Sequence, residues 1–123
     1  MMTPTFSMWL WVALGGAAGS VARMAIALSL PSRFPWAVLA INVAGSALIG
    51  WLMGRLGVPT AENLRWHALA VAGFCGGFTT FSTFSWQTFE QLQKGQTGAA
   101  LLNVGLSVGL CLLATWAGFR LGR

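Results

Sequence analysis

Residues 76–85, GGFTTFSTFS, combine a glycine pair, three phenylalanines and five hydroxyl side chains with no charge. Phe81 and Phe84 are three residues apart, so they share a helix face, with the hydroxyls of Ser82 and Thr83 alongside. Aromatic rings have positive edges and hydroxyls donate hydrogen bonds, so such a column can hold a small anion without a fixed positive charge. The alternative is that the rings pack against lipid or helices while the hydroxyls bond back to the preceding turn. The residues alone leave both readings open.

The glycine pair also bears on the backbone. Gly76 and Gly77 followed by β-branched Thr79 and Thr80 make a poor helix centre, which predicts a break near residues 76–80. A break inside a membrane frees carbonyls and amides that need partners. Free carbonyls can ligate a cation, and free amides at the start of the next half-helix favour an anion.

Two further polar residues interrupt apolar sequence. Asn42, in INVAGSALIG, has an amide that either bonds neighbouring helices together or presents a donor to a passing anion. Arg23, at the end of GGAAGSVAR, either extends to the lipid headgroups or supplies positive potential at a polar vestibule. Spacing does not decide between these roles.

The elements that must position these residues are membrane-spanning helices. Apolar residues make up 56% of the chain, charged residues 7%, and the mean hydropathy is +0.71. Four apolar runs are each long enough to cross, since a span needs about 20 residues. No period-2 alternation suggests barrel strands. We therefore predict an all-α membrane protein, with a single transmembrane domain over residues 1–123 and helices at residues 6–29, 36–54, 66–93 and 98–119.

Charge and residue content exclude several function classes. The net charge of +5 comes from basic residues scattered between the spans, which suits lipid headgroups and argues against a nucleic-acid partner. Glu62 and Glu90 lie outside or at the ends of the spans, so the membrane carboxylate that proton-coupled exchange needs is missing. With no Asp and one His, a hydrolytic triad cannot be assembled, and no enzyme is predicted. We interpret Cys75 and Cys111 as small apolar side chains within the spans.

Topology and size favour assembly. Four helices put both termini on one side with Arg55, Arg65, Arg120 and Arg123, and put Arg33 and Lys94 on the other. Basic loops orient membrane proteins, and the difference in basic residues between the two sides is small here. We therefore hypothesise that the chain inserts in both orientations. No basic residue precedes the first apolar stretch, which is therefore expected to be a retained helix rather than a signal peptide.

Glycine pairs four residues apart occur in every span and let helix backbones approach closely. They serve packing within the bundle, or a homodimer whose interface builds the working site. The pairs are Gly15 and Gly19, Gly50 and Gly54, Gly73 and Gly77, and Gly105 and Gly109.

The string GGFTTFSTFS, with GGAAGSVAR before it in the first helix and NVAGSALIG in the second, resembles the fluoride channels of the Fluc family, also called CrcB proteins. The resemblance covers essentially the whole chain. It implies an antiparallel dual-topology homodimer with two fluoride pores at the subunit interface. It also implies passive export of fluoride through the inner membrane of bacteria, which relieves fluoride toxicity.

The resemblance further implies residue roles. Asn42 corresponds to the pore asparagine, and Phe81 and Phe84 to the phenylalanines whose ring edges face fluoride. Arg23 corresponds to the vestibule arginine of the first helix. The hydroxyl positions of the pore are Ser82, Thr83 and Ser107.

The family also holds a structural sodium ion at the helix break, which here implies the backbone carbonyls of Gly76 and Thr79 from both subunits. Hard cations prefer oxygen ligands, which suits these groups. The chain departs from many relatives at Gln87, where they carry Glu, and at Asn103, where they carry Tyr. Two alternative functions are a small dual-topology multidrug transporter of the four-helix type and a non-transporting membrane subunit.

Overall fold

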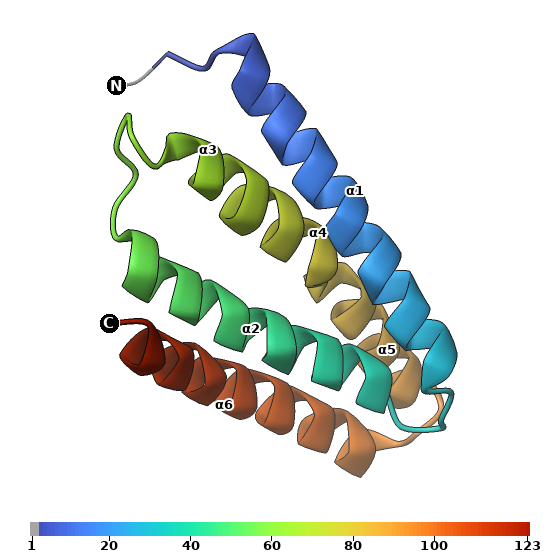
Figure 1. Cartoon of the computed structure of the whole chain (residues 1–123). Helices are drawn as coiled ribbons and strands as arrows, with labels where there is room; N and C mark the ends of the chain where they lie inside the picture. The colour runs from blue at the N-terminus through green and yellow to red at the C-terminus, as the bar shows by residue number, and fades with distance from the viewer. Residues whose placement is uncertain (1–2) are drawn as a thin grey trace.

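The computed structural model describes residues 3–123, and within that range the chain is helical with no strand (Figure 1). Four segments are long and apolar enough to cross a membrane. The chain is therefore an integral, multi-pass membrane protein, as its composition predicts. The helices are α1 (Phe6–Ser29), α2 (Trp36–Leu56), α3 (Leu64–Trp66), η1 (His67–Cys75), α4 (Gly76–Phe78), α5 (Phe81–Gln93) and α6 (Thr97–Gly122).

The helix ends follow local sequence signals. Pro35 precedes the first residue of α2, where a missing N–H costs nothing because the first turn has no intrahelical acceptor. Gly57 follows α2 with a φ of 65°, which favours glycine, and its N–H donates to the Met53 carbonyl at the end of the helix. Gly95, with a φ of 72°, makes the turn between α5 and α6.

The helices pack as two pairs (Figure 1). One pair is α2 with α6, which run parallel; the other is α1 with η1 and α4. A Cβ added to Gly50 would collide with the Thr115 carbonyl, and one added to Gly15 would collide with the Leu69 carbonyl. Glycine therefore sets the close approach of the helix backbones in each pair.

The fourth glycine pair differs from the other three. A Cβ added to Gly105 or Gly109 would meet nothing within 4 Å, whereas those at Gly54 and Gly77 would meet backbone atoms of a neighbouring helix. Packing within the chain therefore accounts for the pairs on α1, α2 and the third span, and leaves the α6 pair without a contact among the described residues.

The third span changes its backbone geometry several times. After the α-helical residues Leu64–Trp66 comes a π-helix over His67–Cys75, a form that is rare at this length. Gly76 and Gly77 remain helical in α4, and the two extended residues are Thr79, with a ψ of 156°, and Thr80, with φ and ψ of −149° and 112°. The glycine pair thus stays within a helix, and the β-branched residues after it take the extended conformation that suits their side chains.

Candidate functional site: an uncharged groove between the helix pairs

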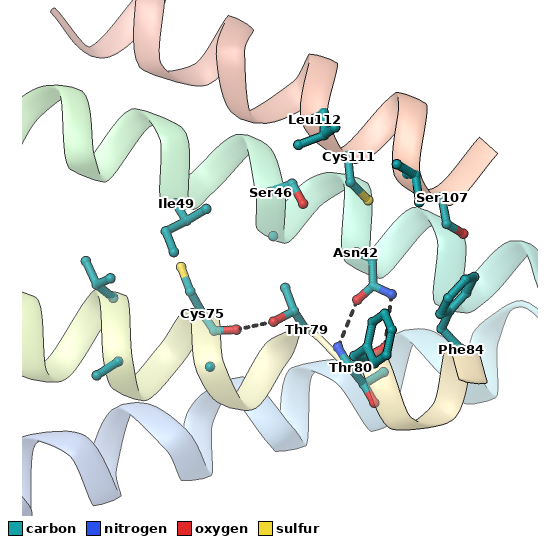
Figure 2. A pocket seen from close by; sticks show the side chains of 16 residues that line it. Asn42, Ser46, Ile49, Cys75, Thr79, Thr80, Phe84, Ser107, Cys111 and Leu112 are labelled. Carbon is teal, nitrogen blue, oxygen red and sulfur yellow. Dashed lines mark hydrogen bonds between the residues drawn. The ribbon is translucent and has the colours of Figure 1, made fainter. Parts of the chain in front are cut away.

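A groove of about 670 Å³ lies between the two helix pairs, at the level of the extended residues (Figure 2). Asn42 and Ser46 of α2 and Ser107 of α6 face it from one side. Phe81 and Phe84 face it from α5. None of the lining residues is charged, so any ion in the groove would meet only dipoles, hydroxyls, ring edges and apolar groups.

Asn42 binds both peptide groups of Thr80. Its Nδ2 donates to the Thr80 carbonyl at 3.1 Å, and the Thr80 N–H donates to its Oδ1 at 2.8 Å (Figure 2). Thr80 is 6% exposed, so without Asn42 both backbone groups would be buried without partners. The asparagine amide therefore replaces the helical hydrogen bonds that the extended conformation gives up.

The Thr80 hydroxyl caps α5. It accepts a hydrogen bond from the Thr83 N–H at 3.2 Å and donates to the Thr83 hydroxyl at 3.1 Å. The Ser82 hydroxyl lies 3.4 Å from the same oxygen. Ser82 and Thr83 are not among the residues that line the groove, because their hydroxyls turn toward this N-cap. Thr80 was not singled out as a site residue, although a Thr immediately before the first residue of a helix is an N-cap signal.

Phe81 and Phe84 both line the groove, with ring centroids 5.4 Å apart and ring planes inclined at 49°. Their exposures differ: Phe84 is buried at 9%, while Phe81 is 78% exposed within a single chain. A tilted pair presents ring edges as well as faces. The predicted pair is therefore brought together, and one of its rings has almost no cover from its own chain.

A second network of side-chain hydrogen bonds links α6 to α5. The Ser107 hydroxyl lies 3.5 Å from the Asn103 Oδ1, the Asn103 Nδ2 donates to the Thr88 hydroxyl at 3.0 Å, and Thr88 donates to the Phe84 carbonyl at 2.8 Å. Asn103 is 1% exposed, so this network lies inside the bundle. Sequence reasoning noted Asn103 only as a departure, since its partner lies 15 residues away on another helix.

Arg23 and Gln87 lie outside the groove lining. Arg23 is half-buried on α1 and makes no ion pair within residues 3–123. The Oε1 of Gln87 is buried without a hydrogen-bond partner among the described residues.

The carbonyls of Gly76 and Thr79 fit the oxygen set that a hard cation prefers. The Thr80 N–H that a continuous helix would direct to the Gly76 carbonyl goes to Asn42 instead, and the Thr83 N–H goes to the Thr80 hydroxyl. Within residues 3–123, no hydrogen bond across the helix ends uses the Gly76 or Thr79 carbonyl. Both residues line the groove, and a Cβ at Gly76 would meet nothing within 4 Å, so the backbone there is open to approach.

Four spans around an uncharged, mostly apolar groove with a few amide and hydroxyl groups define a multi-pass membrane protein whose groove can take a small solute. The family model described as CrcB-like protein, Camphor Resistance (CrcB), matches residues 10–119. The chain therefore belongs to the CrcB family, which confirms the resemblance drawn from its motifs.

Several relatives are similar over nearly their whole length, and each is named a fluoride-specific ion channel FluC. The protein from Paramagnetospirillum magneticum is 50% identical over 117 residues, which cover 87% of this chain and 88% of the relative. The protein from Deinococcus radiodurans is 47% identical over 126 residues, covering 96% and 97%. The protein from Geobacter sulfurreducens is 46% identical over 116 residues, covering 91% and 94%. These names favour neither a multidrug transporter nor a non-transporting subunit.

Proposed function

We propose that this protein is a fluoride-selective ion channel that lets fluoride leave the cell passively. Its relatives are named as fluoride-specific channels, and its groove has the chemistry that a small dehydrated anion needs. Hydroxyl and amide donors with aromatic ring edges replace water around the ion, while no lining carboxylate repels it. The groove lined by Asn42, Phe81, Phe84 and Ser107 is the observation that carries the proposal.

The function is carried by a homodimer. The groove is open along one side, Phe81 is 78% exposed, and a Cβ added to Gly105 or Gly109 of α6 would meet no atom of the described residues within 4 Å. A second copy seated there covers the exposed ring and turns the groove into an enclosed pore. A groove-lining phenylalanine so exposed supports this arrangement, because a closed pathway needs walls on every side.

The two copies insert in opposite orientations in the inner membrane of a bacterial cell. Four basic residues lie on one side and two on the other, with Arg23 near that second side, which gives only a weak orientation preference. Epitope tags at the termini, probed in intact cells and in permeabilised cells, report orientation directly. Tags reached from only one side would refute dual topology while leaving the channel proposal standing.

A sodium ion at the extended residues would tie the two copies together. The carbonyls of Gly76 and Thr79 from each copy would hold it, since they are free of helical hydrogen bonds and open to the groove. Such an ion would supply structural cross-linking at the dimer axis rather than being transported. Dimer stability measured in sodium and in N-methylglucamine buffers tests this role, and equal stability in both would contradict it.

Flux measurements test the function itself. The purified protein is reconstituted in liposomes loaded with equal fluoride and chloride, and efflux of each anion is followed with ion-selective electrodes without a proton gradient. The proposal predicts rapid fluoride efflux with chloride retained. Efflux that requires a proton gradient would instead indicate a carrier, and equal efflux of both anions would remove the assigned selectivity.

A further inference from the structure

A second, apolar groove of about 400 Å³ runs along the seam between α2 and α6, near the ends of both helices. Ile49 and Met53 line it from α2, and Leu112, Trp116 and Phe119 line it from α6. None of the lining side chains is charged, and Trp116 is 60% exposed. In a membrane, such a groove is filled by hydrocarbon or by a protein partner.

Two arginines continue the apolar stripe of α6 beyond the groove. Arg120 is four residues after Trp116 and Arg123 is four residues after Phe119, so both basic residues follow groove-lining residues on the same helix face. The Arg123 guanidinium carbon lies 5.6 Å from the Phe119 ring centroid, which places this cation at the end of the groove. Stacking on a ring face leaves the in-plane N–H groups of a guanidinium free to donate.

Within residues 3–123, no carboxylate forms an ion pair with these arginines. Among residues 3–123 the ion pair found is that of Lys94 with Glu90, in the turn before α6, at the opposite end of that helix (Figure 1). Arg55 lies at the end of α2 beside them and stacks on Trp51, which adds further positive charge. An antiparallel second copy would bring its Arg33 and its Lys94–Glu90 ion pair to this level, so it would add net positive charge rather than neutralise the arginines.

We propose that this groove binds an anionic phospholipid, with an acyl chain lying along the α2–α6 seam and the phosphate held by Arg120 and Arg123. The charge lies at the helix ends, where headgroups sit, and the apolar lining extends from there into the membrane. Arginine pairs recognise phosphate through parallel N–H donors, which gives the site its preference for anionic over zwitterionic lipid. The groove shares Ile49 and Leu112 with the ion groove, but Arg120 and Arg123 lie beyond the ion groove, and the proposal does not depend on which ion the protein carries.

Native mass spectrometry of the full-length protein tests the proposal, with phosphatidylglycerol and phosphatidylcholine of the same acyl chains as probes. Two arginines at a membrane surface predict a preference for phosphatidylglycerol on the order of 30-fold. The Arg120→Gln/Arg123→Gln variant should reduce that preference to within about twofold. The matched control Arg33→Gln/Arg65→Gln removes the same charge from exposed positions outside the groove and should keep it.

The groove itself is tested with Met53→Trp, which fills it without changing charge and should weaken binding of both lipids. Equal preference for phosphatidylglycerol in the two double-arginine variants would overturn the proposal, because scattered surface charge would then explain binding. Unchanged lipid binding in Met53→Trp would overturn the placement in the groove. If Met53→Trp changed the oligomeric mass and left the lipid preference intact, the groove would be assigned to a second copy instead.

Discussion

Replacing Asn42 by alanine should destabilise the protein more than any other single truncation in the groove. The substitution removes both hydrogen bonds to the Thr80 peptide groups, 3.1 and 2.8 Å long, at a residue that is 6% exposed. A net hydrogen bond contributes about 1 kcal/mol, and each buried group left unsatisfied costs about 1–3 kcal/mol. With two groups stranded, we expect a loss of about 3 kcal/mol in the free energy of unfolding.

The matched control is Ser46→Ala, one helical turn along α2. Ser46 also lines the groove, but its hydroxyl makes no side-chain hydrogen bond with the described residues, so its loss should cost less than about 0.5 kcal/mol. Reversible unfolding in mixed detergent micelles, followed by helical circular dichroism, measures both variants against the unchanged protein. Equal stability of Asn42→Ala and Ser46→Ala would refute the role assigned to the asparagine amide.

Two further substitutions test the packing and the cap. Gly50→Ala should separate α2 from α6, because its Cβ would collide with the Thr115 carbonyl. Gly109→Ala should leave the unfolding of a single chain unchanged, since its Cβ would meet no atom within 4 Å. Similar melting temperatures for the two variants in dilute detergent would contradict this. Thr80→Val keeps the side-chain shape but removes the cap of the Thr83 N–H, with an expected loss of about 1 kcal/mol. The same unfolding assay measures it, and an unchanged stability would show that α5 begins without this cap.

The spans could be predicted from sequence because they depend on composition summed over long windows. An apolar run of sufficient length without charge has little alternative to a transmembrane helix, so four spans follow directly from the chain. The bounds of each helix depend on single caps such as Gly57, whose φ of 65° becomes visible only in the folded backbone. The π-helix of His67–Cys75 has no comparable sequence signal.

The residue types of the site could be predicted from the sequence, but the hydrogen bonds between its residues could not. Asn42, Phe81 and Phe84 were singled out as polar or aromatic residues within spans, Ser107 came from the family resemblance, and all four line one groove. The bond from Asn42 to Thr80 joins residues 38 apart in sequence, so periodicity carries no information about it.

The local preferences near Thr80 also compete closely. Gly76 and Gly77 lower helix propensity, yet they stay helical in α4, while Thr79 and Thr80 become extended and find replacement partners. Whether the glycine pair or the threonine pair leaves the helix depends on the hydrogen bonds that the threonines make, since differences in helix propensity are only about 1 kcal/mol per residue. The hydroxyls of Ser82 and Thr83 turn to the resulting N-cap for the same reason.

The most direct test of the central claim compares fluoride efflux from liposomes containing Phe81→Ile and Phe89→Ile. Both phenylalanines are exposed on α5, at 78% and 50%, but Phe81 lines the groove and Phe89 does not. If fluoride passes along the groove, Phe81→Ile should reduce efflux to the rate of protein-free liposomes, while Phe89→Ile should conduct like the unchanged protein. Undiminished fluoride efflux through a correctly assembled Phe81→Ile protein would contradict the account.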